Sequence, residues 1–480
     1  MPRLVSILLG LCASGVAGLR VAIIGGGVAG LSCAQELKAL GVKSTVFDTG
    51  KRDVGGRCST RNDQTKGVVF EHSAQVIVAR DDSFLEFCTS RVSSGELRQF
   101  GGGIDVMTCS PQAPSTLTPL EIDSRRLFVG SRGMQSLAEA LSKGLDDVRG
   151  DTWVSSIAKV SGATGWTLRE APGEQYDAVV IAHNGKCADN LMAKSTLGES
   201  ESSASAVHDL LKVSFGATLR DPQRMLKMNL CSLYVLVFLG PKGLFPVVSG
   251  KELGVDPSSA RVVNGHPVLS WMCDTTLKLG LDQQGDGGKE EHSYSLVSTR
   301  EYGSANKVSQ ENIPPDKRAA VTSDMLKAAE ELCGLPAGSM TPSFSRLQLW
   351  GAAVPLNRHS APCVWDGQAR LAVCGDWFTP AATTRGPSVE TAFLSGKRCA
   401  QIIARGLLQG QGSDDCVGIE SGKHNFVACL GSPLGDLGIS GGLPVEGPKL
   451  VFGKSPAKIA VAAVAGAAGA VGQKRWVKKT

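Results

Sequence analysis

Short apolar runs alternate with helix-like segments in the first part of the chain. Residues 19–24 (LRVAII) form a β-branched apolar run, which predicts a buried strand of a parallel sheet. Residues 31–40 show helical spacing that stops at Gly41, and residues 42–47 predict a second strand. Further segments of these kinds, two strands and one amphipathic helix, lie at 177–182, 371–374 and 388–403. The alternation predicts an α/β fold with a Rossmann-like domain.

The middle of the chain has a different pattern. Strand-like runs are separated by turns rather than by helices, at residues 213–219, 233–239, 268–271 and 294–299. Residues 318–333 then predict a helix. This part is expected to form an antiparallel sheet with helices, an α+β domain that interrupts the Rossmann-like one.

A glycine-rich loop joins the first predicted strand to the first helix. Gly25, Gly27 and Gly30 match the pattern G-x-G-x-x-G. Gly25 allows the tight turn, Gly27 lets a pyrophosphate approach the backbone, and Gly30 lets the helix lie close to the strand. Asp48 ends the second strand, where a carboxylate can bind the hydroxyls of an adenosine ribose. The arrangement predicts a dinucleotide site; the alternative is a purely structural turn.

A second glycine pair follows Asp48. Gly55, Gly56 and Arg57 would add backbone N–H groups and a cation near the pyrophosphate, which favours FAD over NAD. The alternative is a surface turn with a solvated arginine. Gly375 and Asp376 end the strand at 371–374, where a carboxylate can bind the ribityl hydroxyls of a flavin; the alternative is an ordinary turn at the end of a strand.

The helix at 388–403 follows these residues. It carries Val389 in its first turn, and its N-terminus could face the flavin ring. Glu390, the next residue, is interpreted as either a site residue or a solvated helix position.

These motifs, in this order, resemble the flavin amine oxidase superfamily. Within it, segments 67–78, 128–145, 180–191 and 347–357 resemble renalase-like FAD/NAD(P)-binding oxidoreductases of plants and algae, and the resemblance covers residues 19 to 405. It implies non-covalent FAD. Trp153 and Val154 are expected on a strand that precedes the one at 177–182, and the resemblance implies that Val154 contacts the adenine unless that residue merely packs in the core. It also implies hydride transfer from a small reduced substrate, such as a dihydronicotinamide, to flavin N5. Dioxygen would then reoxidise the flavin and give hydrogen peroxide.

No catalytic residue can be assigned from the sequence. Gln75, His72, Trp350 and Trp377 are the weak candidates for positions near the flavin ring, and a structural histidine or core tryptophans are the alternatives. The segment 67–78, which contains His72 and Gln75, resembles an Asp/Glu-x-Gly-Ala/Ser-Gln motif of the superfamily, but Ser73 replaces the glycine of that motif. Two other functions stay open: an amine or polyamine oxidase on the same fold, and a flavin-binding scaffold without turnover.

These motifs also divide the chain. Residues 19–80, 125–200 and 365–408 are assigned to a discontinuous FAD-binding domain, and residues 81–124 and 201–364 to a substrate domain. Residues 1–18 have the pattern of a signal or targeting segment, with the alternative of an apolar extension of the first strand. A cleaved signal would direct the chain to the secretory pathway or to an organelle such as a plastid.

Residues 409–480 form a low-complexity tail. Its apolar stretch at 459–472 reaches only about 21 Å as a helix, so membrane contact through it would be weak.

Composition narrows the partners. The chain has 50 basic and 45 acidic residues, for a net charge of +5, which argues against a nucleic-acid binder. The 14 cysteines include no C-x-x-C pair and the seven histidines are scattered, so no metal site is expected. Four cysteines within apolar stretches are interpreted as small buried hydrophobic residues: Cys33, Cys231, Cys374 and Cys399. The expected partners are a small-molecule substrate, which could be NAD(P)H-like, and dioxygen.

Overall fold

The structure is a computed structural model. It describes residues 18–63, 68–110, 113–120, 122–161, 165–183, 185–197, 201–216, 226–245, 258–282, 290–408, 416–419 and 426–429. The predicted signal segment, except its last residue, and the apolar stretch at 459–472 lie outside these ranges. Within them, no helix combines the length and the apolar character that a membrane crossing needs.

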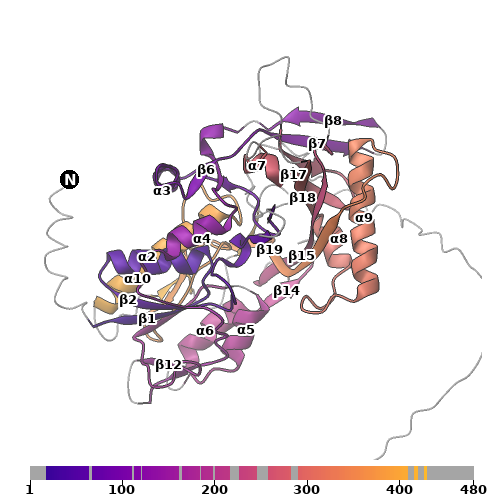
Figure 1. Ribbon diagram of the computed structural model, residues 1–480. Coiled ribbons are helices and arrows are strands. Elements are labelled where there is room, and N and C mark those ends of the chain that lie inside the picture. Colours follow the sequence, from indigo (N-terminus) through magenta and orange to yellow (C-terminus); the bar gives the residue numbers. More distant parts are fainter. Residues whose placement is uncertain are drawn as a thin grey trace, which may run out of the picture. The chain divides into compact units, whose positions relative to one another are not determined.

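A largely parallel sheet organises the first half of the fold (Figure 1). Its strand order is β10-β2-β1-β13-β22-β21-β23, and the first five strands run parallel. The strands are β1 (Arg20–Ile24), β2 (Lys43–Phe47), β10 (Asp147–Arg149), β13 (Ala178–Ile181), β22 (Leu371–Val373), β21 (Val364–Asp366) and β23 (Cys416–Val417). The sheet therefore joins segments that lie more than three hundred residues apart in the chain, as the Rossmann-like prediction requires.

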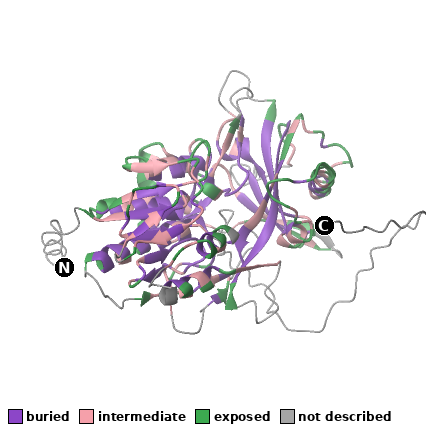
Figure 2. Ribbon diagram, turned by 90° about the horizontal axis from the view of Figure 1, so that it is seen from below, coloured by how far each residue is buried: buried purple, intermediate pink, exposed green. Residues whose placement is uncertain are grey.

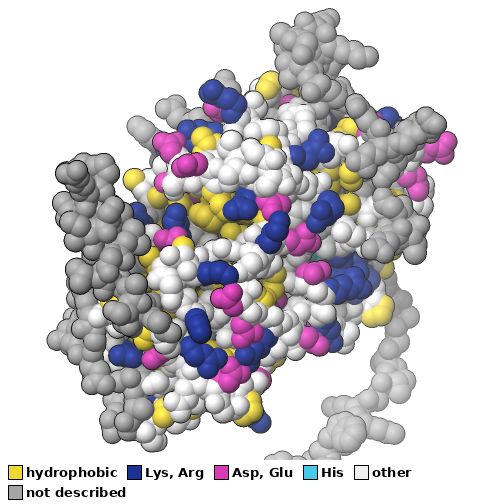
Figure 3. Space-filling view, turned by 60° about the vertical axis from the view of Figure 1, so that its left-hand side comes forward, with side chains coloured by type: hydrophobic (Ala, Val, Ile, Leu, Met, Phe, Trp, Pro, Cys, Tyr) yellow, Lys and Arg dark blue, Asp and Glu magenta, His cyan; other side chains and the backbone are white. Residues whose placement is uncertain are grey.

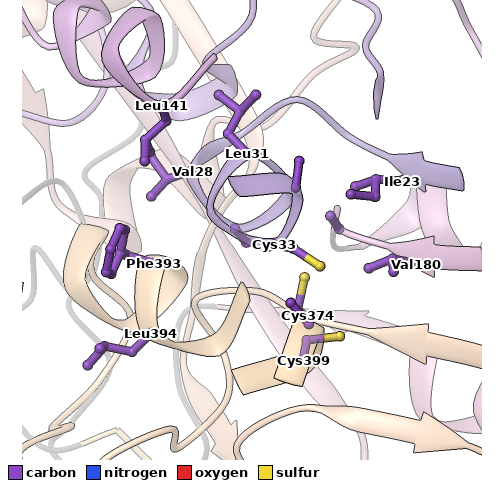
Figure 4. Close-up of a cluster of buried hydrophobic side chains, with 14 of the residues drawn as sticks. Ile23, Val28, Leu31, Cys33, Leu141, Val180, Cys374, Phe393, Leu394 and Cys399 are labelled. Carbon is purple, nitrogen blue, oxygen red and sulfur yellow. The ribbon is translucent and has the colours of Figure 1, made fainter. Parts of the chain in front are cut away.

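Two long helices cover one face of this sheet. Helices α2 (Val28–Ala39) and α10 (Val389–Leu408) pack against each other and against the sheet. In Figure 4 the sulfur atoms of Cys33, Cys374 and Cys399, from α2, the loop after β22, and α10, face one another within this core. All three side chains are fully buried, as is Cys231, which confirms the interpretation of these cysteines as core residues.

The other elements of this half complete its layers. The opposite face of the sheet packs against α5 (Lys186–Ala193), α6 (Glu201–Leu211) and the hairpin β11 (Ile157–Lys159)–β12 (Trp166–Leu168). Helices α3 (Asp82–Ser93) and α4 (Gln135–Ser142) join the core of α2 and α10. Short strands beside them are β5 (Ile77–Val78), β9 (Leu127–Gly130), β6 (Leu97–Gln99), β3 (Arg61–Asp63), β4 (Val68–Phe70), β20 (Asn357–His359) and β24 (Phe426–Ala428). Two 3-10 turns are η1 (Gly56–Cys58) and η2 (Ser124–Arg126).

A larger mixed sheet forms the second half. Its order is β14-β15-β18-β17-β16-β7-β8, and β19 pairs with β15. The strands are β14 (Val213–Phe215), β15 (Met228–Pro241), β18 (Glu291–Ser298), β17 (Leu269–Asp274), β16 (Ala260–Asn264), β7 (Ile104–Ser110), β8 (Ala113–Pro119) and β19 (Phe344–Pro355). Most pairs are antiparallel, as predicted, although β14–β15 and β16–β7 are parallel. The segment 81–124 thus divides, with α3 in the first half and β7 and β8 in the second.

Strand β15 separates two apolar cores. Its alternate residues, such as Leu233 and Val235, face the core shared with the first half, whereas Leu236 and Phe238 face helix α9 (Pro315–Cys333). Figure 2 shows the central strands of this sheet, β15, β16, β17 and β18, as almost continuously buried. Two shorter helices, α7 (Thr275–Lys278) and α8 (Arg300–Ala305), follow strands of the sheet.

One local prediction is wrong. Trp153 and Val154 were expected on a strand, but they lie in a loop after β10. The chain turns at Asp151, whose φ is +48°, and the N–H of Thr152 then bonds to the carbonyl of Asp48 at 2.8 Å. These contacts tie the loop to the end of β2 and prevent the strand from continuing.

A buried histidine links three parts of the large sheet. His292 on β18 bonds through Nδ1 to Asp274 at 2.7 Å and through Nε2 to Asp282 at 3.0 Å. Asp274 also accepts from the N–H of Leu277 and so caps α7. Burial opposes protonation of the imidazole, but the two carboxylates outweigh it and raise the pKa of His292.

This raised pKa predicts a loss of stability with rising pH. The stabilisation is fully present below the unfolded pKa, about 6.5, and is lost as pH rises through the higher folded value. Urea midpoints measured from pH 5.5 to 9 should therefore fall more steeply for the wild-type protein than for His292→Gln. Parallel midpoint curves for the two proteins would contradict this assignment.

Candidate functional site

A cavity with a volume of about 290 Å³, open to solvent, lies at the carboxyl ends of the parallel strands. Its walls include residues at or just after the ends of β1, β2, β13 and β22, which is where doubly wound folds bind their ligands. The predicted cofactor residues that line it are Gly25, Gly27, Asp48, Gly55, Gly56, Arg57, Val154, Gly375, Asp376 and Val389.

The glycine-rich loop and the N-terminus of α2 form one end of the cavity. A Cβ built on Gly27 would meet no protein atom within 4 Å, so the position faces open space. Gly30 does not line the cavity; a Cβ there would lie 2.0 Å from the carbonyl oxygen of Gly25. Gly27 therefore leaves room for a ligand, whereas Gly30 allows the helix to pack on its own loop. The first N–H groups of α2 have no partners within the helix and can bind an anion.

Asp48 is held rigidly at the end of β2. Its two carboxylate oxygens accept hydrogen bonds from the N–H groups of Gly26 at 2.7 Å and Gly50 at 2.8 Å. Each oxygen keeps a further lone pair for a ligand hydroxyl. The side chain is thus oriented for the ribose role that its sequence position predicts.

Arg57 and Asp376 form a bidentate ion pair in the wall of the cavity. Both contacts between the guanidinium and the carboxylate are 2.7 Å, and Arg57 also donates to the carbonyl of Ala353 at 2.9 Å. The N–H of Gly55 bonds to the carbonyl of Gly26, which attaches this turn to the glycine-rich loop. Arg57 is therefore held inside the site, and the alternative of a solvated arginine is wrong.

The first turn of α10 forms another wall. Val389 lines the cavity, and the next residue, Glu390, is buried behind it. Glu390 accepts hydrogen bonds from the N–H groups of Arg80 at 2.6 Å and Asp81 at 2.7 Å, so its interpretation as a solvated residue is wrong. Burial raises the pKa of this carboxyl, although the two backbone bonds oppose the shift. The contacts fix the helix terminus beside the cavity.

The four candidates for positions near a flavin ring differ in how close they lie to the cavity. Trp350 lines the cavity, and its Nε1 donates to the carbonyl of His72 at 2.7 Å. The His72 and Trp350 rings meet edge to face at 5.9 Å. Burial, aided by Arg61 and Arg346, lowers the pKa of His72 to about 3, so its imidazole is neutral.

Gln75 and Trp377 do not line the cavity. The amide of Gln75 donates to the carbonyls of Glu71 and Ser73 and accepts from Ser295, so it belongs to a buried network. Trp377 is fully buried and stacks beside Phe378 in the core on the far side of the sheet. Both side chains therefore stabilise the fold and do not contact the cavity.

Several wall residues were missed by sequence reasoning. His183, just after β13, lines the cavity, and burial lowers its pKa to about 4. Its Nδ1 has no hydrogen-bond partner among the described residues. The position was predictable, because the residue after a parallel strand lies at the same sheet edge as Asp48 and Asp376. Other wall residues occupy positions that no sequence pattern marks as part of a site: Cys58, Ala74, Trp153, Cys187 and Ala352.

The surface charges on one face of the molecule are mixed. On the face shown in Figure 3, basic and acidic side chains are interspersed, in keeping with the small net charge. Among the described residues, no group of three or more His, Cys, Asp or Glu side chains is arranged to hold a metal ion.

Comparisons with known proteins agree with this geometry. A family model described as an NAD(P)-binding Rossmann-like domain matches residues 23–89, the segment with the glycine-rich loop, Asp48 and Arg57. Cyclohexylamine oxidase from Brevibacterium oxydans IH-35A is similar in structure, with a TM-score of 0.53 and 13% identity over 81% of this chain and 99% of that one.

Two further solved structures are similar to the same extent. A candidate protoporphyrinogen oxidase from Exiguobacterium sp. 255-15 has a TM-score of 0.52 and 12% identity over 82% of this chain and 100% of that one. A fatty acid isomerase from P. acnes that produces CLA has a TM-score of 0.50 and 11% identity over 80% and 99%. At such identities the likeness shows a shared fold, which confirms the predicted fold class. The three proteins are named for different reactions, so the fold does not select among them.

Proposed function

We propose that this protein is an FAD-dependent oxidoreductase. The observation that carries the proposal is the single cavity whose walls combine Asp48 and the glycine-rich loop with Asp376 and Val389, more than three hundred residues later in the chain. A site for NAD alone would need only Asp48 and the glycine-rich loop. Asp376 and Val389 extend the site in the direction that a flavin would occupy.

The residues present fit an FAD molecule. Gly27 leaves space where a pyrophosphate would approach, and the N-terminus of α2 opens beside it. Asp48 would hold the adenosine ribose, and Val154, in the loop tied to β2, lies where it could contact the adenine. Arg57 would neutralise phosphate charge, and Asp376 would bind ribityl hydroxyls. We expect these contacts to bind the cofactor non-covalently.

A bound flavin would supply the redox chemistry, accepting a hydride from the substrate and passing electrons to dioxygen with release of hydrogen peroxide. The chain's own residues would bind and orient the flavin and the substrate and keep water away from them. The N-terminus of α10, fixed through Glu390, offers a positive dipole end toward the ring. Trp350 closes one wall with its indole fixed on His72, and the neutral His72 adds no charge beside the ring.

The reduced donor proposed is a small molecule such as a dihydronicotinamide, as in renalase-like enzymes. An amine or polyamine oxidase on the same fold is less well supported, because the only carboxylates among the cavity-lining residues are Asp48 and Asp376. Both have roles in cofactor binding, which leaves no acidic wall for an ammonium group. A flavin-binding scaffold without turnover remains the non-enzymatic alternative.

Anaerobic mixing tests this proposal. The full-length protein, reconstituted with FAD, is mixed with a panel of reduced nicotinamide isomers and amines, and the visible flavin band is followed. We expect one nicotinamide isomer to bleach the band within seconds, and subsequent oxygen to restore it with one peroxide per flavin. Bleaching by an amine instead would favour the amine oxidase. A flavin that no donor reduces would favour the scaffold, and a variant lacking residues 409–480 would then be tested for altered location.

A further inference from the structure

Two arginines lie together on one side of the Trp350 wall. Arg61 is on β3, directly opposite Phe70 on β4. The ring of Phe70 contacts Phe344 on β19 at 5.1 Å, and Arg346 follows Phe344 by two residues. Since alternate residues of a strand share a face, Arg346 emerges on the same side of β19 as Phe344.

This side of β19 also forms the wall of the cavity. Phe344 and Trp350 pack toward the core shared with the first half, whereas Leu347 and Leu349 face α9. Arg346 therefore lies on the same face as Trp350, four residues or about 13 Å away along the strand. His72, which touches Trp350, is the neighbour whose protonation both Arg61 and Arg346 disfavour. Strands β3 and β19 thus carry two cations on the side of Trp350, just outside the residues that line the cavity.

Neither arginine is neutralised within the described part of the chain. Neither forms an ion pair there. Arg346 is exposed, and Arg61 is partly buried, with its Nε buried and without a hydrogen-bond partner. Burial, together with Arg346 and Arg52, lowers the pKa of Arg61, as expected where cations face one another. Holding like charges together costs free energy, and an unpaired buried donor adds to that cost. The two guanidinium groups therefore keep N–H donors available for an anionic ligand.

We propose that Arg61 and Arg346 bind the carboxylate or phosphate of an anionic substrate whose reacting part lies beside Trp350. The proposal rests on the function proposed above and names the charge class of its substrate. A guanidinium presents a planar fork of N–H donors that matches either anion. The same two cations would repel an ammonium substrate, so they act as specificity-determining residues against amines.

A matched pair of ligands tests the charge class. Benzoate and benzylammonium have similar size and opposite charge, and phenyl phosphate replaces the carboxylate by a phosphate. Their binding to the FAD-loaded, full-length protein is measured by calorimetry and by perturbation of the flavin spectrum. The variants are Arg61→Gln, Arg346→Gln and the double variant. Arg125→Gln, which removes an exposed arginine paired with Asp123, is the control for net charge.

We expect wild-type protein to bind benzoate or phenyl phosphate at least about tenfold more tightly than benzylammonium. Each single substitution should weaken anion binding by about tenfold, the scale of one charge-assisted hydrogen-bonding group, and Arg125→Gln by less than twofold. Tighter binding of phenyl phosphate would indicate a phosphorylated substrate, and of benzoate a carboxylic acid. Preference for benzylammonium, absence of anion binding, or equal anion affinity in all variants would overturn the proposal.

The test separates this inference from the proposed function. If the protein fails to retain FAD, the proposed function fails, whereas calorimetry still reports whether Arg61 and Arg346 bind the anions. If FAD is retained and reduced by a donor but the anions bind equally well to the wild-type protein and to the arginine variants, only the inference fails. Urea unfolding of each variant verifies that a loss of binding is not a loss of fold.

Discussion

Gly27→Val is expected to abolish FAD retention while leaving the unliganded protein folded. The Gly27 backbone is extended (φ −77°, ψ 178°), which any residue can adopt, and a Cβ there meets no protein atom within 4 Å. The valine side chain would instead occupy the space next to the N-terminus of α2, where the pyrophosphate is proposed to lie. FAD affinity should fall by about a hundredfold or more, equivalent to roughly 3 kcal/mol.

Gly30→Ala is the matched comparison. Its Cβ would lie 2.0 Å from the carbonyl oxygen of Gly25, so the helix would have to move away from the loop. We expect this variant to lose stability, by about 1–3 kcal/mol or more, even without cofactor. FAD retention is measured by gel filtration and the flavin-to-protein absorbance ratio, and stability by urea unfolding of the unliganded proteins. Wild-type FAD occupancy in Gly27→Val would refute the placement of the pyrophosphate.

Lys278→Met should produce the largest loss of stability among the side chains considered. Lys278 and Glu71 form an ion pair with both side chains fully buried, and the ammonium also donates to the carbonyl of Gln75 at 3.0 Å. Burial opposes the charge of Lys278, yet Glu71 keeps the pKa of the ammonium above its ordinary value. Removing the lysine leaves a buried carboxylate without its cation, which costs about 3–5 kcal/mol.

A double substitution distinguishes this explanation from a simple packing defect. Glu71→Gln combined with Lys278→Met removes both charges while a side-chain oxygen remains to accept from the N–H of Met134. The double variant should therefore recover much of the stability that Lys278→Met loses. Lys38→Met is the control, because the Lys38–Asp146 pair is largely exposed and its loss should cost less than about 1 kcal/mol. Equal urea midpoints for the single and double variants would contradict the ion-pair explanation.

The parts of the site that were predictable from the sequence are those set by local rules. The glycine-rich loop, the strand before it and Asp48 at the end of β2 lie within one short segment, so turn chemistry and strand pattern suffice to place them. Asp376 was predictable for the same reason, as a residue directly after a buried strand. The relation between these two segments then followed from the shared edge of a parallel sheet.

The parts that were not predictable depend on contacts between distant segments. Glu390 looks like an ordinary helix residue until Arg80 and Asp81 donate to it. Gln75 looks like a site residue until Lys278 and Ser295 hold its amide in a buried network. Val154 reaches the cavity through a turn rather than on a strand. In each case the partner lies far along the chain, where neither periodicity nor local propensity carries information.

The measurement that tests the account most directly is the FAD content of the purified full-length protein. The protein is incubated with excess FAD, separated from free cofactor by gel filtration, and denatured so that released flavin can be measured against protein. The account predicts about one FAD per chain for the wild-type protein and almost none for Gly27→Val. A folded wild-type protein that stays colourless after this treatment would contradict the assignment of the cavity to FAD.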